Sequence, residues 1–271
     1  MKKRILITGS TDGIGKLAAE KLATAGHELY LHGRNSEKLS EVVSVLKTAS
    51  GNSAIHGYVV DFSDLQAVQT IGKQIAEDLG QLDVLINNAG VFKSTNRLTD
   101  AGLDLRFTVN YLAPYLLTQQ LLPCLAQSTG ARIINLSSAA QSRVSLRALV
   151  GREELSMQEA YAQSKLALTI WSFELARQYP EITTIAVNPG SLLNTNMVRE
   201  AYGRHWSPAE KGGNILYDLA LDSTYANASG KYFDNDKGNP KGDFGDAHPD
   251  AYEKEVAQQL IDKTQAVLAT I

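Results

Sequence analysis

Tyr161 and Lys165 are spaced for proton transfer. The two residues are four positions apart in a segment of helical period, so both side chains lie on one face of the predicted helix and the ammonium group can approach the phenol. A neighbouring positive charge favours the phenolate and lowers the pKa of a tyrosine from about 10 toward neutrality, where a general acid or base works well. A Tyr-Lys pair is also a common surface contact, so the surrounding elements must decide between the two interpretations.

A second pattern is the glycine loop, residues 8–15, with the sequence Thr-Gly-Ser-Thr-Asp-Gly-Ile-Gly. It follows an apolar run and opens a segment of helical period, which is the setting of a dinucleotide-binding turn. Glycine permits a tight turn and a close approach of the backbone to a pyrophosphate, while the free N–H groups at the helix start face the phosphates. A simple strand–helix turn is the alternative. The residues expected to bind the cofactor here are Gly9, Ser10, Thr11, Gly13, Ile14 and Gly15.

Six short, β-rich runs alternate with longer segments of helical period. Strands buried on both faces read as continuous apolar runs, and strand–helix alternation implies parallel strands joined by right-handed crossovers. We therefore predict an α/β fold, a three-layer, doubly wound parallel sheet of the Rossmann type. The predicted pairs of strand and helix are 4–8 with 14–25, 28–32 with 36–49, 54–60 with 64–79, 83–87 with 99–127, 132–137 with 156–178, and 183–187 with 208–221.

The alternation weakens after residue 221. Residues 226–250 are rich in Gly, Asn, Asp and Pro, which is a loop composition, and a helix is predicted over 249–269. The run Gly-Lys-Tyr-Phe at 230–233 is a candidate last strand. Since no linker or repeat divides the chain, we predict a single domain over 1–271 that includes a C-terminal extension over 226–271.

Composition excludes several classes of protein. The 271 residues are 44% hydrophobic and 20% charged and carry a formal charge of -3, a balance typical of a soluble globular domain. The chain has no run of like charges that could bind a phosphate backbone, so no nucleic-acid partner is expected. Residues 109–126 are apolar but interrupted by polar residues and two prolines, which predicts a buried helix and no membrane span.

Cysteine and histidine usage limits the remaining possibilities. Cys124 is the only cysteine, so an intramolecular disulfide is excluded and we expect a small buried side chain in a reducing, cytoplasmic compartment. The N-terminal apolar run is shorter than a signal peptide needs. His205 and His248 lack metal-ligand spacing, so no metal site is expected.

Further motifs follow the glycine loop in a fixed order along the chain. They are Asn-Asn-Ala-Gly at 87–90 after the fourth predicted strand, Asn110 in the next helix, Ser137-Ser138 after the fifth strand, Tyr161 with Lys165, and Asn-Pro-Gly at 188–190 after the sixth strand. The set resembles the short-chain dehydrogenase/reductase family over residues 4–221, and more loosely beyond. The resemblance implies an NAD(P)-dependent oxidoreductase that transfers a hydride between nicotinamide and a carbonyl or alcohol substrate.

The resemblance assigns catalytic roles to four residues. Tyr161 is the general acid/base, and Lys165 lowers its pKa and binds the nicotinamide ribose. Ser138 hydrogen-bonds the substrate oxygen, and Asn110 anchors a water relay behind the lysine. Taken singly, the serine could cap a strand end and the asparagine could satisfy buried backbone. Their joint occurrence favours catalysis, whereas Ser137 is expected to be structural.

Cofactor contacts beyond the glycine loop also follow from the resemblance. Asp61 matches the residue that contacts adenine, although capping of the helix that starts near Asp64 is an alternative. Thr195 matches the threonine that binds the nicotinamide carboxamide, but its spacing from Pro189 is one residue longer than usual. The expected contacts are Asp61, Phe62, Asn88, Ala89, Gly90, Tyr161, Lys165, Pro189, Gly190 and Thr195.

The end of the second predicted strand bears on the choice of nicotinamide cofactor. An acidic residue there selects NAD, whereas an arginine accommodates the 2′-phosphate of NADP. The family position of the acid is Gly33, and Arg34 matches the phosphate-binding position. Asp12 in the glycine loop argues the other way, because many NADP-using members have a basic residue there. We expect NADP(H) to be preferred over NAD(H).

The segment between Ser138 and Tyr161 spans 23 positions, longer than in many compact members. This length resembles the retinol-dehydrogenase-like and protochlorophyllide-reductase-like branches and makes bulky lipophilic carbonyl or alcohol substrates plausible. Loops beyond the carboxyl ends of parallel strands line the cleft, so residues 191–212 are expected to form a substrate lid. Its candidate apolar wall, for which simple packing is the alternative, is Leu146, Met197, Tyr202 and Trp206.

Two further expectations concern assembly and alternative functions. Helices around 103–127 and 156–178 resemble those that pair into dimers and tetramers in the family, so a homodimer or homotetramer is expected. A non-catalytic NADP(H)-sensing regulator on the same fold is the alternative function, although a sensor has no chemical need for Ser138, Tyr161 and Lys165 together. A sugar-nucleotide epimerase is disfavoured by the absence of a large C-terminal substrate domain.

Overall fold

A single eight-stranded sheet runs through the computed structural model, which describes residues 2–238 and 242–271. The strand order is β3-β2-β1-β4-β5-β6-β7-β8, with β8 antiparallel to β7 and every other neighbouring pair parallel. The strands are β1 Arg4–Ile7, β2 Glu28–Gly33, β3 Ile55–Val59, β4 Val84–Asn87, β5 Arg132–Leu136, β6 Thr183–Asn188, β7 Lys231–Asp234 and β8 Asp243–Gly245.

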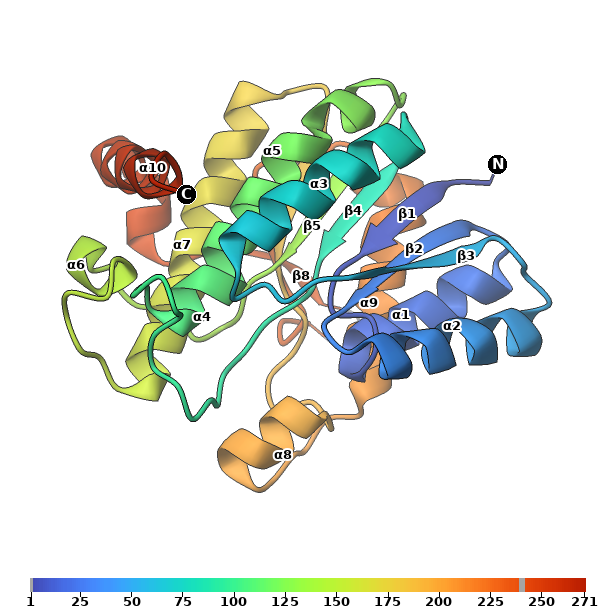
Figure 1. Cartoon of the computed structure of the whole chain (residues 1–271), viewed down its shortest axis with the longest axis horizontal. Coiled ribbons are helices and arrows are strands. Elements are labelled where there is room, and N and C mark those ends of the chain that lie inside the picture. Colours follow the sequence, from blue (N-terminus) through green and yellow to red (C-terminus); the bar gives the residue numbers. More distant parts are fainter. Residues whose placement is uncertain (1, 239–241) are drawn as a thin grey trace.

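Helices cover both faces of this sheet (Figure 1). Helices α1, α2 and α9 pack on one face, and α3, α5, α7 and α10 lie on the other. The three-layer, doubly wound fold predicted from the strand–helix alternation is thereby confirmed. The helical elements are α1 Gly13–Thr24, α2 Ser36–Ser50, α3 Leu65–Leu79, α4 Leu105–Phe107, η1 Thr108–Leu112, α5 Ala113–Ala126, α6 Leu146–Leu149, α7 Met157–Gln178, α8 Asn196–Tyr202, α9 Ala209–Leu221, η2 Ser223–Tyr225, η3 Pro249–Tyr252 and α10 Lys254–Leu268.

The apolar strands build two cores because successive side chains of a strand point to opposite faces. In β1, Ile5 and Ile7 enter the core beneath α1 and α9, whereas Leu6 enters the core beneath α3 and α5. All three side chains are completely buried. Such burial on both faces is the reason that the strands read as unbroken apolar runs in the sequence.

The sheet has its topological switch point between β1 and β4. The chain proceeds outward from β1 through β2 to β3, and then returns to the other side of β1 to continue through β4, β5 and β6. The loops after β1 and β4 therefore leave the sheet in opposite directions, and a crevice opens between them at the carboxyl ends of the strands. The glycine loop and the Asn88 loop meet at this point.

The long helix predicted over 99–127 begins later and is interrupted. Its first turn is capped at Asp104, whose Oδ1 accepts hydrogen bonds from the backbone N–H of Arg106 (2.9 Å) and Phe107 (3.2 Å). The preceding residues form a turn in which Gly102 has a φ of 75°, a conformation that ends helical geometry. A π-helical turn, η1, then separates α4 from α5 and contains Asn110.

The C-terminal extension folds back onto the sheet and its helices. Lys231–Asp234 forms the last parallel strand, close to the expected 230–233, and β8 adds an antiparallel strand that the sequence did not predict. The helix predicted over 249–269 divides into η3 and α10.

Helix α10 packs across α7 and η1. Leu260 and Ile261 are buried there, and the Tyr111 and Thr264 hydroxyls are 2.7 Å apart. Helix α10 thus covers part of the two helices, around 103–127 and 156–178, that were expected to pair between subunits. The oligomeric state stays a prediction. Within the described residues, no helix is long and apolar enough to cross a membrane.

Candidate active site

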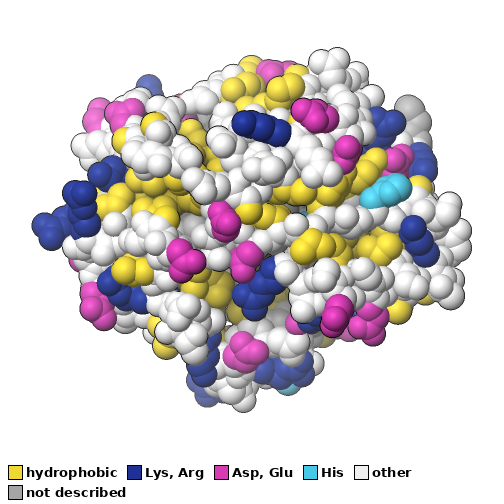
Figure 2. All heavy atoms as spheres, in the orientation of Figure 1, with side chains coloured by type: hydrophobic (Ala, Val, Ile, Leu, Met, Phe, Trp, Pro, Cys, Tyr) yellow, Lys and Arg dark blue, Asp and Glu magenta, His cyan; other side chains and the backbone are white. Residues whose placement is uncertain are grey.

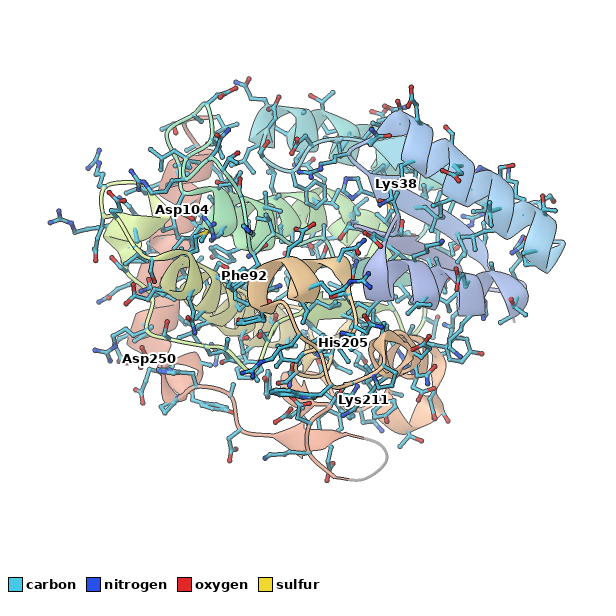
Figure 3. The ribbon with its side chains drawn as sticks, turned by 90° about the horizontal axis from the view of Figure 1, so that it is seen from below. Lys38, Phe92, Asp104, His205, Lys211 and Asp250 are labelled. Atoms are coloured by element: carbon cyan, nitrogen blue, oxygen red, sulfur yellow. The ribbon has the colours of Figure 1, made fainter. Side chains whose placement is uncertain are left out.

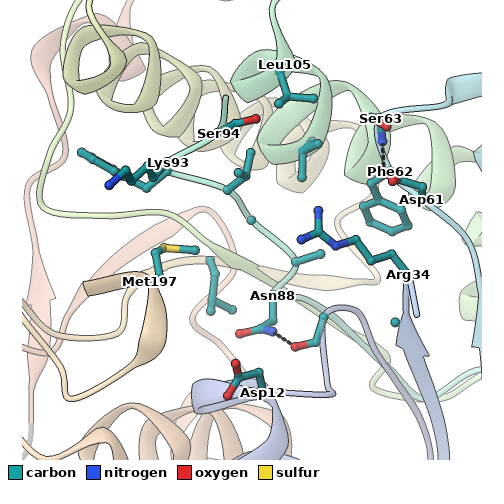
Figure 4. A pocket seen from close by; sticks show the side chains of 18 of the residues that line it. Asp12, Arg34, Asp61, Phe62, Ser63, Asn88, Lys93, Ser94, Leu105 and Met197 are labelled. Carbon is teal, nitrogen blue, oxygen red and sulfur yellow. Dashed lines mark hydrogen bonds between the residues drawn. The ribbon is translucent and has the colours of Figure 1, made fainter. Parts of the chain in front are cut away.

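A cleft of about 1490 Å³ lies at the carboxyl ends of the parallel strands. Its walls come from the loops after β1, β2, β3, β4, β5 and β6, and from the lid segment that contains α8. We call the part around Ser138, Tyr161 and Lys165 the inner end, and the part around Asp12 and Arg34 the outer rim. Figure 4 shows the outer rim, with the Arg34 side chain reaching into the pocket.

The inner end brings together the three residues expected to carry the chemistry. Tyr161 and Lys165 lie one turn apart on α7, Ser138 follows β5, and all three residues line the same end of the cleft. The Lys165 Nζ lies 5.6 Å from the centre of the Tyr161 ring and donates to the Leu136 carbonyl oxygen at 2.6 Å. The i, i+4 arrangement expected from the sequence is therefore present.

The pKa of Tyr161 moves in the direction opposite to the sequence expectation. Burial raises the pKa of Tyr161 to about 12, against the opposing effect of the nearby Ser138 side chain. Burial also lowers the pKa of Lys165 to about 8. Desolvation disfavours the charged form of each group. The protein's own groups therefore keep Tyr161 as a protonated phenol at neutral pH.

Asn110 fixes the wall of the inner end. Its Oδ1 accepts from the Val91 N–H at 2.7 Å, and its Nδ2 donates to the Val91 carbonyl (3.0 Å) and to Ser164 Oγ (3.0 Å). Ser164 Oγ in turn donates to the Tyr161 carbonyl at 2.7 Å. The asparagine amide thus links the segment after β4 to α7. Ser164 was not singled out from the sequence.

Gly90 leaves room for the catalytic side chains. A Cβ added at this position would meet Asn110 Oδ1 at 3.3 Å and Lys165 Nζ at 3.5 Å. The buried Ser137 hydroxyl contacts Thr169 Oγ1 at 2.6 Å and donates to the Lys165 carbonyl at 3.2 Å, contacts that fit the structural role expected for it.

Hydrogen bonds and close packing hold the glycine loop against the segment after β4. The Asn88 Nδ2 donates to the carbonyls of Thr8 and Gly9 at 2.8 Å each. A Cβ at Gly9 would meet the Ala89 Cα at 2.7 Å, and one at Gly15 would meet the Asn88 Nδ2 at 2.3 Å. These two glycines are therefore required for packing of the loop against the segment after β4.

Ser10 differs from its expected role. Its buried hydroxyl donates to the His32 carbonyl at 3.2 Å and accepts from the His32 N–H at 3.1 Å. Because both hydrogen bonds join the Ser10 hydroxyl to the backbone of β2, this side chain fixes the glycine loop to that strand. Neither Ser10 nor Gly15 is among the residues that line the cleft, whereas Gly9, Thr11, Gly13 and Ile14 are.

His32 is a supporting residue that sequence reasoning missed. Its Nδ1 accepts from the Gly9 N–H at 3.1 Å, and its Nε2 pairs with the Val60 carbonyl at 2.9 Å. Burial lowers its pKa to about 4, so the ring is neutral, with one nitrogen accepting and the other donating. The ring stacks on Phe62 at 4.2 Å between centroids.

Asp12 and Lys38 form an ion pair at the outer rim. The Asp12 carboxylate accepts from the Gly13 N–H at 2.8 Å, from Asn196 Nδ2 at 2.6 Å and from Lys38 Nζ at 3.4 Å. Burial opposes the charged carboxylate, but these bonds hold the pKa of Asp12 below its ordinary value. Lys38, also missed from the sequence, compensates the negative charge that argued against NADP.

Asp61 lines the cleft and does not cap α3. Its Oδ1 accepts from the Ser63 N–H at 2.9 Å, whereas Asp64 accepts from the Ala67 N–H at 3.0 Å and is the helix cap. The alternative interpretation of Asp61 is therefore wrong. Asn88, Ala89, Gly90, Pro189 and Gly190 also line the cleft.

The lid segment begins after Gly190 and crosses the cleft. Thr195 caps α8 by accepting from the Val198 N–H at 3.3 Å, and its Cγ2 would lie 3.6 Å from a Cβ at Gly13. Within this segment, Leu192 has a left-handed backbone conformation with a φ of 46°.

An aromatic contact joins Tyr202 of the lid segment to Tyr161 through Phe92. The Phe92 ring lies 5.0 Å from that of Tyr161 and 5.5 Å from that of Tyr202. Figure 3 shows Phe92 beside α8 near the centre of the molecule. Figure 2 shows hydrophobic side chains along a band across the face seen in Figure 1.

Two of the residues expected to form the apolar wall of the cleft differ in their positions. Met197 lines the cleft, whereas Leu146 packs against the core, which was the alternative given for it.

Charged side chains of both signs are interspersed over the face seen in Figure 2. In residues 2–238 and 242–271, no group of three His, Cys, Asp or Glu side chains could hold a metal ion. Cys124 is buried, as expected.

Comparison with known proteins places these features in context. The sequence profile of the short chain dehydrogenases matches residues 3–205. Human retinol dehydrogenase 13 is 31% identical, over 95% of this chain and 82% of that protein. A protein from Streptomyces sp. (strain C5), described as the daunorubicin C-13 ketoreductase DnrU, is 32% identical over 88% of this chain and 85% of its own length.

A solved structure gives the corresponding comparison in three dimensions. The crystal structure described as a short chain dehydrogenase from Escherichia coli CFT073 complexed with NADPH superposes with a TM-score of 0.71. Its sequence is 27% identical, and the match covers 86% of this chain and 95% of that one.

Proposed function

Because the chain belongs to the short-chain dehydrogenase family, in its retinol-dehydrogenase-like branch, we propose that it is an NADP(H)-dependent carbonyl reductase or alcohol dehydrogenase with Tyr161 as its general acid/base. The observation that carries this proposal is the meeting of Ser138 and Tyr161 in one cleft, with the buried Lys165 ammonium 5.6 Å from the centre of the Tyr161 ring. The nicotinamide, when bound, supplies or accepts the hydride.

Tyr161 moves the proton in this scheme. During carbonyl reduction the Tyr161 hydroxyl donates a proton to the substrate oxygen, and during alcohol oxidation the phenolate takes it back. A phenol whose pKa is near 12 holds its proton at neutral pH, which suits reduction. Ser138 orients the substrate oxygen, since its Oγ is itself fixed by the Ala140 N–H at 3.1 Å. Lys165 keeps a cation beside the phenol and binds the ribose.

The outer rim supports a preference for NADP(H). Arg34 projects into the cleft in Figure 4, where its planar donors suit a 2′-phosphate. A Cβ at Gly33 would lie 2.5 Å from Thr11 Cγ2, so the position leaves no space for the acidic side chain that selects NAD. Lys38 adds a second cation at the rim.

The remaining cleft residues fit the rest of a dinucleotide. Gly9, Thr11, Gly13 and Ile14 would hold the pyrophosphate at the start of α1, where free N–H groups and the helix dipole favour anions. Asp61 and Phe62 would hold the adenine end. The residues that would contact the nicotinamide end are Asn88, Ala89, Gly90, Pro189, Gly190 and Thr195.

We also propose a bulky, lipophilic carbonyl or alcohol substrate. The Phe92 ring lies beside Tyr161, and Met197 of the lid, residues 191–212, adds apolar surface to the same cleft. By their names, two relatives act on retinol and on the C-13 ketone of daunorubicin. Loops at this edge of a parallel sheet are the usual substrate-binding elements, which supports the same reading.

A cofactor-consumption assay tests the proposed function. Purified protein is given NADPH or NADH with a panel of aldehydes, ketones, quinones and polyene carbonyls, and Tyr161→Phe is the matched variant. The expected result is turnover with NADPH that falls by about 10²–10⁴-fold in the variant, with NADPH binding retained. Equal turnover in the variant would remove Tyr161 from the mechanism. Binding of NADPH without turnover on any compound would favour the cofactor-sensing alternative.

A further inference from the structure

The loop between β6 and the lid has an unusual backbone. Pro189 and Gly190 line the inner end of the cleft, and Leu192 follows with a φ of 46°. Among the described residues, Leu192 is the single non-glycine position with a positive φ. L-residues adopt this conformation only at a cost, so neighbouring contacts must hold the loop in place.

Asp236, which lies in the turn after β7, supplies those contacts. Its carboxylate accepts from the Ser191 N–H at 2.9 Å and from the Ser191 hydroxyl at 2.6 Å. The Lys211 ammonium lies 3.8 Å from the same carboxylate. Burial opposes the charged form, yet these bonds hold the pKa of Asp236 below its ordinary value. Ser191 immediately precedes the strained Leu192, so the carboxylate fixes the loop at its critical point.

Asn188 links Asp236 to Gly190, which lines the cleft. Its Nδ2 donates to Asp236 Oδ2 and to Asp234 Oδ1, at 2.8 Å each. Its Oδ1 accepts from the Gly190 N–H at 3.2 Å. The orientation of the Asn188 amide, and with it the position of Gly190, is therefore set by two carboxylates on the neighbouring strand and turn.

Asn235 fastens both ends of the lid from the same turn. Its buried Nδ2 donates to the Pro189 carbonyl at 2.8 Å and to the Lys211 carbonyl at 3.2 Å. Within the lid, the Asn194 N–H donates to the Ser207 carbonyl at 2.8 Å. The turn after β7 thus holds the base of the lid, while the lid closes on itself further out.

We propose that Asp236 is a positioning residue for hydride transfer, which sets the Pro189–Ser191 backbone against the nicotinamide. The proposal rests on the proposed function, because it assigns that backbone to the nicotinamide end of the cofactor. Asp236 touches neither cofactor nor substrate and acts through Ser191 and Asn188. Three groups donate hydrogen bonds to Asp236: the Ser191 N–H, the Ser191 hydroxyl and the Asn188 Nδ2. Only a carboxylate accepts from all three at once, because an amide would present its own N–H groups to one of them.

The test compares Asp236→Asn with Asp236→Glu and with Asp246→Asn. Asp246 is an exposed carboxylate on the same C-terminal segment, so its variant makes the same charge change away from the loop. Each protein is assayed for thermal midpoint, for NADPH affinity by fluorescence titration without substrate, and for kcat and the carbonyl KM. We expect Asp236→Asn to lower NADPH affinity and kcat by at least about tenfold each, with little change in carbonyl KM. Partial recovery is expected in Asp236→Glu, and no change in Asp246→Asn.

Two results would overturn the proposal. One is an Asp236→Asn protein that binds and turns over NADPH like the unaltered protein. The other is a variant with a lower thermal midpoint but unchanged affinity and kcat, which would make Asp236 purely structural. The binding titration needs no turnover, so it still tests Asp236 if the unaltered protein reduces none of the carbonyls. Failure of the proposed function is thereby distinguished from failure of this inference.

Discussion

The side chains that support the inner end of the cleft, Asn110 and Lys165, are buried and hydrogen-bonded, whereas Lys38 and Asp12 at the outer rim are half exposed. Asn110 and Lys165 are 1% and 4% exposed, but the side chains of Lys38 and Asp12 are 50% and 48% exposed. A reacting centre needs fixed geometry in a dry environment, while recognition of a charged phosphate tolerates solvent. Substitutions at the inner end should therefore reduce kcat, and those at the rim should change only cofactor affinity.

Lys165→Met gives the largest expected effect. The variant keeps a side chain of similar length but removes the ammonium beside Tyr161, so we expect kcat to fall by about 100-fold or more. The thermal midpoint should not fall, because burial already penalises the charged lysine, as its pKa of about 8 indicates. Steady-state kinetics and thermal unfolding at pH 7 measure the two effects. A loss of activity that merely followed a lower thermal midpoint would contradict this separation of catalysis from stability.

His32 supplies a second test, beneath the glycine loop. Its folded pKa of about 4 lies below the ordinary value of 6.5, so the unfolded chain binds the extra proton first. Stability should therefore be fully present above pH 6.5 and be lost as the pH falls from 6.5 toward 4. The expected loss is on the order of 3 kcal/mol.

Denaturant unfolding at several pH values measures this loss, with His32→Asn as the matched variant. The variant should be less stable at pH 7, since it loses the ring contact with the Val60 carbonyl and the stacking on Phe62, and its stability should depend less on pH between 6.5 and 4. Identical pH dependence in both proteins would mean that other groups, rather than His32, carry the acid sensitivity of the loop.

The difference between the two ends of the cleft also explains which features could be predicted from sequence. The doubly wound sheet was predictable because the alternation of apolar runs and helical period is local. Tyr161 and Lys165 were predictable because they share one helix face. The late start of the helix before Asn110 was missed, although Asp104 carries a cap signal that could have located it.

The supporting residues could not be predicted, because their partners are distant in sequence. His32 meets Gly9 across 23 positions, Asp236 meets Ser191 across 45, and Asn196 meets Asp12 across 184. No local pattern records such pairings, and only the closed fold creates them. The same reasoning accounts for the pKa of Tyr161, because the depth of its burial depends on residues from several separate elements.

The smallest expected effect is at the outer rim. Arg34→Ala and Lys38→Ala each remove a cation from the cofactor's 2′-phosphate side, so each should raise the KM for NADPH by about 10-fold. The KM for NADH and the value of kcat should stay unchanged, because neither side chain reaches the inner end. Lys47→Ala is the control, since Lys47 is exposed at the other end of α2. Equal loss of NADPH and NADH affinity in the Arg34 variant would show that this arginine supports the loop rather than the phosphate. In that case the exposed rim, like the buried inner end, would have to be read as part of the structural frame.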